Sequence, residues 1–362
     1  MAAPNVWRRT VETPFKNVVK NKPPPSKKVC SFWLSGRCVY GDRCRNHHPP
    51  FLNTDGHLSL LGRLNGHKGD ICGICLPTDS DKLLTGYRDG TVRIWDCNSG
   101  KCVSVLNLQN QIGSMHCEGS WIFYGLPNLL QARKDNEVYE LDGPVGQVYA
   151  ITSARSDTVF AGAQNGDILV WRGFPSPPNS NPFRLIGTLK GHTTPVTCLT
   201  VGGGKLYSGS MDGTVRVWDT ESFVCINTVE AHSDCITSLV YWGVYLITSS
   251  RDKSIKIWAT IHEEGLQEAY THQERHSILA LHGMNDANNK PVICCSCEDS
   301  SVRIYELPSF MERGRLLSKR NVHSIQSCPY NLFFTGDGAG TVTVWNWLED
   351  PQPQGINGSS SS

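Results

Sequence analysis

Residues 191–219 read GHTTPVTCLTVGGGKLYSGSMDGTVRVWD. A β-branched run interrupted by polar residues occupies 196–201, and the glycines at 202–204 mark a turn. A second short strand is expected at 205–208 and a third at 214–219, where apolar and polar residues alternate. No helical period of about 3.6 residues competes with this pattern. The segment therefore predicts three antiparallel strands joined by tight turns.

Six further units echo this segment. Aligned on Trp218, the equivalent positions lie 38 to 47 residues apart, close to the roughly 40–45 residues of a four-stranded propeller blade. A six-bladed alternative would leave residues 110–142 as a long irregular insertion, which is uncommon in a compact domain. We therefore predict an all-β, seven-bladed propeller in which the polar insertions at 173–183 and 285–290 are exposed loops. The seven aligned positions hold Trp95, Arg133, Trp171, Trp218, Trp258, Tyr305 and Trp345.

The pattern resembles the WD-repeat family from about residue 58 to 347. The family signature is a Gly-His pair, a Ser or Thr in the second strand, an Asp in the next turn and a closing Trp-Asp. The resemblance implies that these side chains form a hydrogen-bonded set that fixes each blade. Units that depart from the signature, at Asn165, Pro127, Arg133, Tyr305 and Ala339, are expected to rely more on packing. The complete sets are His67, Thr85, Asp89 and Trp95; His192, Ser208, Asp212 and Trp218; and His232, Thr248, Asp252 and Trp258.

The two ends of the repeat region are expected to pair. The last unit ends just after Trp345 without residues for an outer strand, while residues 57–64 precede the first unit without a partner of their own. Pairing them would close the ring and remove free sheet edges. The predicted organisation is a disordered basic arm at 1–29, a metal-binding segment at 30–48, a linker at 49–56, the propeller at 57–349 and a disordered tail at 350–362.

Charge is unevenly distributed along the chain. The formal net charge is +1, yet residues 1–50 carry ten Lys or Arg against two acids, a net +8 that leaves −7 on the remaining 312 residues. The basic head predicts a polyanionic partner. No stretch reaches the roughly 20 apolar residues that span a bilayer, and Arg8 and Arg9 lie where a signal peptide would be apolar. We expect a soluble intracellular protein, in the nucleus rather than the cytoplasm.

Most of the fifteen cysteines lie singly inside apolar strand runs, as Cys198, Cys235 and Cys294 do. This pattern predicts buried free thiols in a reducing compartment. Cys72 and Cys75 have the spacing of a redox motif, but side chains three residues apart on a strand point to opposite faces. We therefore expect no redox chemistry there.

The exception is the group Cys30, Cys38, Cys44 and His48, with intervals of seven, five and three residues. Three thiolates and one imidazole are a complete tetrahedral ligand set for zinc. So short a segment cannot build a core of its own, so a single structural zinc ion would supply its folding free energy. The adjacent His47 is an alternative fourth ligand.

This spacing resembles the CCCH zinc-finger family, and residues 30–48 are called the finger from this point on. Many members bind single-stranded RNA by stacking bases on aromatic rings, which implies stacking on Phe32, Trp33 or Tyr40. The family's best RNA binders carry an aromatic residue two positions before the final His, where this chain has Asn46. The aromatic residues are alternatively the small core of the finger. The bases expected to meet phosphates are Lys27, Lys28, Arg37, Arg43 and Arg45.

A single finger followed by WD repeats resembles a plant family of combined CCCH-finger and WD-repeat proteins, across nearly the whole chain. The resemblance implies a nucleic-acid-binding adaptor in RNA metabolism or gene regulation, with RNA or DNA on the finger and proteins on the propeller. The alternative is a pure protein scaffold whose finger docks protein. We expect neither an enzyme nor a small-molecule substrate, because His and Asp recur at repeat positions and four protein ligands leave zinc no open position. In the wider WD-repeat family the residue before the turn Asp often faces a partner, which implies partner contacts at Arg88, Met211 and Arg251.

Overall fold

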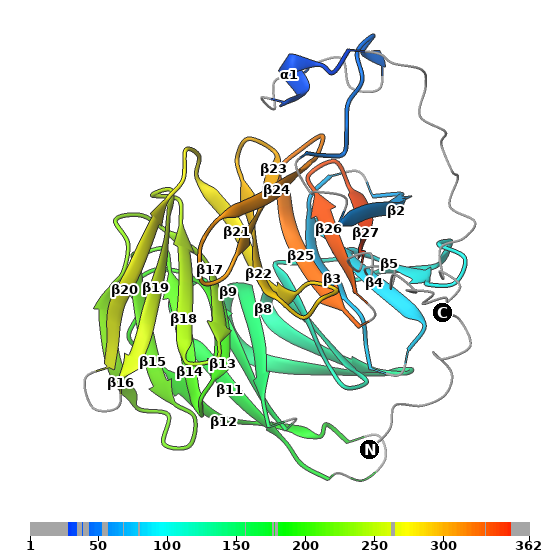
Figure 1. Ribbon diagram of the computed structural model, residues 1–362. Coiled ribbons are helices and arrows are strands. Elements are labelled where there is room, and N and C mark those ends of the chain that lie inside the picture. The colour runs from blue at the N-terminus through cyan, green and yellow to red at the C-terminus, as the bar shows by residue number, and fades with distance from the viewer. Residues whose placement is uncertain are drawn as a thin grey trace, which may run out of the picture.

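The computed structural model describes residues 28–34, 38, 43–52, 57–67, 69–78, 80–155, 157–175, 177, 180–261, 265–329 and 331–348. Within these residues the chain forms strands and one short helix, α1 (Ser31–Leu34), and no helix has the length and apolar character to cross a membrane. The strands build six sheets around a common centre, and α1 lies outside this ring of sheets, beyond β23 and β24 (Figure 1). Most of the predicted basic arm and the whole predicted tail lie outside the described residues.

Three sheets each contain four consecutive antiparallel strands, as the repeat at 191–219 predicts. Glycines in left-handed turns, such as Gly213 with φ 78°, let the chain reverse between strands. The first sheet contains β3 (Ile71–Cys75), β4 (Lys82–Tyr87), β5 (Thr91–Asp96) and β6 (Cys102–Asn107). The second contains β13 (Val196–Gly202), β14 (Lys205–Ser210), β15 (Thr214–Asp219) and β16 (Cys225–Glu230). The third contains β17 (Ile236–Trp242), β18 (Tyr245–Ser250), β19 (Ser254–Ile261) and β20 (Gly265–Gln273).

Two further sheets are completed by segments from the N-terminal part of the chain. In one, β2 (Leu58–Asn65) pairs antiparallel with β27 (Thr341–Trp347), with Leu58 opposite Trp347, which confirms the predicted pairing of the two ends. That sheet continues through β26 (Leu332–Asp337) and β25 (Val322–Cys328). In the other, β1 (Phe51–Leu52), from the predicted linker, pairs with the outer strand of a sheet made of β21 (Ile278–Asn285), β22 (Pro291–Cys297), β23 (Ser301–Glu306) and β24 (Glu312–Leu317).

The predicted count of seven blades is wrong, because the second and third units share one sheet. Pro127 stands where other units have their turn Asp, and the strand runs through this position to Lys134 instead of ending. The next strand pairs with its predecessor through its first half and with its successor through its second half. The propeller therefore has six sheets. The shared sheet consists of β7 (Ser114–Glu118), β8 (Trp121–Lys134), β9 (Glu137–Ala154), β10 (Thr158–Ala163), β11 (Ile168–Gly173) and β12 (Phe183–Leu189).

The hydrophobic core lies between neighbouring sheets. Trp218 of β15, for example, packs with Phe160 and Val170 of the preceding sheet. Burial of rings of this size stabilises the contact between sheets. At the Trp or Tyr position, the register between the third strand and its outer neighbour shifts in every sheet, as at Val217/Trp218 and Ile304/Tyr305. Such bulges bend the strand locally, so the units share a backbone irregularity as well as a sequence pattern.

Candidate metal centre and nucleic-acid interface

Four side chains of the finger converge. One ligand atom from each of Cys30, Cys38, Cys44 and His48 lies within 4.8 Å of the others. Cys30 is buried, and the other three are half-buried. Three sulfurs and one imidazole nitrogen match the donor set of a closed tetrahedral zinc site, so these residues fit zinc. His48 belongs to the group, whereas the neighbouring His47 does not.

Backbone hydrogen bonds bring the ligands together. The N–H of Cys30 donates to the carbonyl of His47 at 3.0 Å, and the N–H of His47 donates to the carbonyl of Lys28 at 2.9 Å. The two segments thereby form a parallel bridge, and the His47 backbone is fixed so that the next residue supplies the ligand. Burial raises the pKa of the Cys30 thiol, but hydrogen bonds from the Trp33 backbone and with Cys44 more than offset it, so this pKa lies below its ordinary value.

The two aromatic residues of α1 have different surroundings. Trp33 is 8% exposed, its ring stacks on His48, and its Nε1–H donates to the carbonyl of Pro49 at 2.8 Å. The interpretation of this ring as part of the finger's core is therefore supported. Phe32 is 64% exposed, so much of its side chain is accessible to solvent. Tyr40, the third predicted stacking residue, lies outside the described residues.

The predicted phosphate-contacting bases are placed in part. Arg43 and Arg45 are exposed on the finger, and Lys28 is exposed just before it. Lys27 and Arg37 lie outside the described residues. Arg43 and Arg45 flank Cys44, so a folded metal centre would fix the backbone on both sides of this ligand.

The finger rests on the propeller. Cys30 and Trp33 pack with Leu317 at the end of β24, and Leu52 of β1 contacts the same cluster. Phe51 of β1 lies opposite Leu316, its ring meets Trp345 edge-on with centroids 6.3 Å apart, and the N–H of Leu317 donates to the carbonyl of Pro50 at 2.7 Å. Figure 1 shows the chain descending from α1 to β24. The segment between finger and propeller therefore adds a strand to a sheet and fixes where the finger sits.

Two of the three predicted repeat sets are complete. Trp218 Nε1–H donates to Ser208 Oγ at 2.9 Å, Ser208 Oγ bonds His192 Nε2 at 2.7 Å, and His192 Nδ1 bonds Asp212 at 3.2 Å. The set of His232, Thr248, Asp252 and Trp258 has the same bonds, at 2.7–3.0 Å. The set of His67, Thr85, Asp89 and Trp95 is incomplete. His67 Nε2 bonds Thr85 at 2.8 Å, but His67 Nδ1 has no hydrogen-bond partner among the described residues.

These histidines are structural. Burial lowers the pKa of His192 and His232, and lowers that of His67 to about 4, so all three are neutral near pH 7. A neutral imidazole can accept a hydrogen bond at Nε2 from the hydroxyl and donate at Nδ1 to the carboxylate. The Ser-His-Asp arrangement therefore recurs as a device that links the strands of a blade. It does not mark a single catalytic centre.

Sequence reasoning missed Glu274 as a member of these sets. Glu274 lies four residues before β21, as His192 lies four residues before β13. Its buried carboxylate accepts hydrogen bonds from the guanidinium of Arg303 and the hydroxyl of Tyr305, and Arg303 also pairs with Asp299 at 3.2 Å. Two sequence features could have indicated this role. Glu274 occupies the position of the signature His, four residues before the first strand, and Tyr305 replaces the signature Trp in the same unit.

The predicted partner-binding residues lie on turns between second and third strands. Arg88, Met211 and Arg251 are all exposed, and Met211 is 47% exposed. Arg88 pairs with Asp70 at 3.9 Å, a distance at which a surface ion pair contributes little to stability. Their exposure is consistent with partner contact, and their roles stay predictions.

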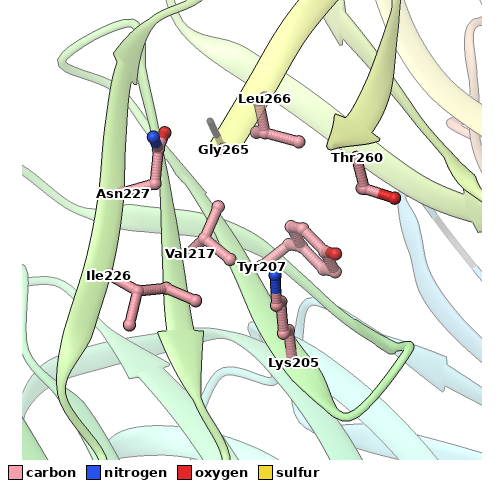
Figure 2. Close-up of a pocket in the computed structure, with 8 residues that line it drawn as sticks. All are labelled: Lys205, Tyr207, Val217, Ile226, Asn227, Thr260, Gly265 and Leu266. Atoms are coloured by element: carbon pink, nitrogen blue, oxygen red, sulfur yellow. The ribbon is translucent and has the colours of Figure 1, made fainter. Parts of the chain in front are cut away.

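A pocket of about 120 Å³ lies between the second and third four-stranded sheets. Figure 2 shows Lys205 and Tyr207 on one side of it, with Leu266 and Thr260 across from them. Among the described residues that line the pocket, none is a histidine or a carboxylate. It therefore offers no acid–base pair, and we assign it no chemistry.

Known proteins resemble this chain in both of its parts. The family described as WD domain, G-beta repeat matches residues 58–96, 183–219 and 223–259. "Zinc finger CCCH domain-containing protein 17" of Oryza sativa subsp. japonica is 46% identical over 325 residues, which cover 89% of this chain and 73% of the relative. "Zinc finger CCCH domain-containing protein 48" of Arabidopsis thaliana is 46% identical over 330 residues, which cover 91% of this chain and 75% of that protein.

A solved structure supports the fold. The WD40 beta propeller domain of Doa1 matches with a TM-score of 0.67 over 81% of this chain and 97% of that chain. The sequence identity is 19%, so this likeness bears on the fold alone.

Proposed function

Because the chain belongs to the family of CCCH zinc finger domain-containing proteins with WD repeats, we propose that it is a nucleic-acid-binding adaptor. The finger would bind single-stranded RNA or DNA, and the propeller would hold protein partners through its exposed turns. Such a protein would act in RNA metabolism or gene regulation without chemistry of its own.

The observation that carries this proposal is that Phe32 and several basic side chains in and next to the finger are exposed. Phe32 is 64% exposed, Arg43 and Arg45 are exposed on the same finger, and Lys28 is exposed two residues before it. Base stacking on an aromatic ring is worth about 1–3 kcal/mol and tolerates any base sequence. Positive charge around the ring would add attraction to phosphates that decreases as salt increases.

Zinc would have a structural role in this function. Cys30, Cys38, Cys44 and His48 would hold one ion, and their convergence within 4.8 Å is the observation that supports it. The ion would supply the folding free energy of the finger. The residues of the chain then do the binding: α1 presents Phe32, and the Cys44 segment presents its two flanking arginines.

A second function is favoured by the position of Trp33. This ring is committed to the core, and Asn46 stands where the resembled RNA binders have an aromatic residue, so stacking platforms are few. In this case the finger would dock protein, as it already docks on β24. The chain would then be a scaffold at both ends.

Fluorescence anisotropy on the zinc-loaded full chain separates the two functions. A labelled random RNA of about 12 nucleotides and the matching DNA would be titrated at about 50 mM salt. We expect binding that Phe32→Ala weakens about 5- to 150-fold, the equivalent of one lost stack. Met311→Ala removes a 65% exposed side chain from the propeller and is the matched control, expected to leave binding unchanged.

Absence of binding at low salt would reject the nucleic-acid function, as would binding that neither Phe32→Ala nor zinc removal affects. Proximity labelling with the full chain and with a Cys30→Ser, Cys38→Ser variant would then test the scaffold. Proteins labelled by the full chain and lost from the variant would be the partners of the finger.

A further inference from the structure

We propose that the nucleic-acid surface continues from the finger onto the propeller, through the loop at residues 318–321, called the rim loop. This inference rests on the proposed nucleic-acid function. It assigns to one sheet of the propeller a role in binding the same single-stranded nucleic acid as the finger, in addition to holding protein partners.

The finger and the rim loop belong to one contact region. Leu317, the last residue of β24, packs with Cys30 and Trp33, and the rim loop begins at the next residue. Pairing of β1 with β24 and the bond from the Leu317 N–H to the Pro50 carbonyl hold the finger at this end of the sheet. A single-stranded nucleic acid bound on the finger therefore has the rim loop as its neighbouring protein surface.

Both sides of this junction carry exposed bases. Lys319 and Arg320 follow Leu317 by two and three residues and are exposed. Arg43 and Arg45 flank Cys44, which packs on the same cluster from the finger side. Backbone phosphates of a single strand are the polyanion that such a row of bases attracts.

Two described carboxylates, Asp337 and Asp70, lie near the rim loop. Asp337 is buried and accepts hydrogen bonds from Ser318 Oγ at 2.8 Å and from the N–H groups of Ala339 and Thr341. Asp70 lies beside Gly338, which borders Arg320, and pairs with Arg88 at 3.9 Å. Arg88 adds a further positive charge to those of Lys319 and Arg320, so these two acids offset only part of the positive charge around the tip.

The rim loop is held in one shape. The Ser318 N–H donates to the Ser300 carbonyl at 3.0 Å, the Ser300 hydroxyl bonds the Asn321 side chain at 3.0 Å, and the Gly338 N–H donates to the Asn321 carbonyl at 2.8 Å. The residues before and after the tip are thus anchored to two neighbouring turns. A fixed loop loses less conformational entropy on binding than a flexible one, so the two bases at its tip are preorganised for phosphates.

The test compares oligonucleotide lengths on the zinc-loaded full chain. Affinities for single-stranded RNA and DNA of about 4 and about 16 nucleotides would be measured against salt for the native chain and for Lys319→Ala, Arg320→Ala. For the longer strands we expect the slope of log affinity against log salt to become shallower by about 1.4, the loss of two phosphate contacts. The shorter strands, which reach only the finger, should bind both proteins equally.

Two further variants complete the test. Lys101→Ala, Lys190→Ala removes two exposed lysines that adjoin β6 and β12, in other sheets, and should leave the slope unchanged. Phe32→Ala should weaken long and short strands alike. If Phe32→Ala weakens binding while the rim-loop variant keeps the native slope, the rim-loop inference is overturned and the proposed function stands. If no strand binds, both fail. Equal melting temperatures would confirm that the variants are folded.

Discussion

The indole ring of Trp33 lies parallel to the imidazole ring of His48, with 4° between their planes and 4.3 Å between their centroids. The indole N–H is fixed by the Pro49 carbonyl, so the ring cannot turn away without losing a hydrogen bond. Trp33 thereby sets the orientation of the His48 side chain. Groups that orient a metal ligand tune affinity for the metal although they do not touch it.

We expect Trp33→Leu to weaken zinc binding by about 10- to 100-fold, the usual effect of losing a group that orients a ligand. Leucine keeps an apolar side chain but supplies neither the stack nor the N–H donor. Competition with a chromophoric zinc chelator measures the change. Phe32→Leu alters the exposed neighbour and is the matched control. Equal zinc affinities of Trp33→Leu and the native chain would contradict the orienting role.

Glu274 holds the buried side chains of Arg303 and Tyr305 in place. Its side chain is 1% exposed, and the Arg303 side chain that pairs with it is 6% exposed. Glu274→Gln should lower the free energy of unfolding by about 3 kcal/mol, because Arg303 keeps its charge and loses a buried partner. Urea denaturation would measure this. Glu312→Gln breaks the more exposed pair with Arg315 and should cost less than about 1 kcal/mol. Similar losses in the two variants would contradict the assigned role of Glu274.

The sequence predicts those features that depend on local repeats. The set of His192, Ser208, Asp212 and Trp218 forms as expected, because the strand period and the turns place these residues on adjacent strands of one sheet. The convergence of the four candidate ligands was also predictable, since four ligands within 19 residues can be brought together by local turns alone. Pairing of β2 with β27 followed from counting strands, because each end lacked a partner.

Contacts between distant segments were not predictable in the same way. The pairing of β1 with β24 joins residues more than 250 positions apart through backbone groups, which leave no side-chain signature. Spacing suggested a separate second blade, but spacing does not reveal that β8 continues past Pro127. Asp286 belongs to an insertion expected to be exposed, yet it is buried and accepts a hydrogen bond from Arg313 at 2.6 Å. The polar sequence of the insertion suggested exposure, because the sequence does not reveal that Arg313 on β24 pairs with Asp286.

Closure of the ring by β2 should dominate thermal stability. Leu58 and Leu64 are 3% and 2% exposed, and losing each such side chain costs about 2–5 kcal/mol. Deletion of residues 57–64 should therefore lower the melting temperature by about 10 °C or more. Leu58→Ala should give a smaller decrease in the same direction, while Val103→Ala, at a 54% exposed strand position, is the control. An unchanged melting temperature after the deletion would reject the closure by β2.

The half-buried His282 should make the propeller less stable in mild acid. Burial lowers the pKa of His282 from its ordinary 6.5 to about 4. Its Nε2 accepts the N–H of Ser327 at 3.1 Å, a hydrogen bond that protonation of Nε2 would remove. Between these two pKa values the unfolded chain binds more protons than the folded one, so stability decreases as the pH falls from about 6.5 to about 4.

The contribution of His282 should be roughly 2–3 kcal/mol over that window. His282→Gln keeps an acceptor for the Ser327 N–H and removes the titrating group, so its unfolding free energy should fall less between pH 7 and pH 4.5 than that of the native chain. Urea denaturation at several pH values measures the difference. If His282→Gln lost as much stability in acid as the native chain, the neutral state assigned to this half-buried histidine would be wrong.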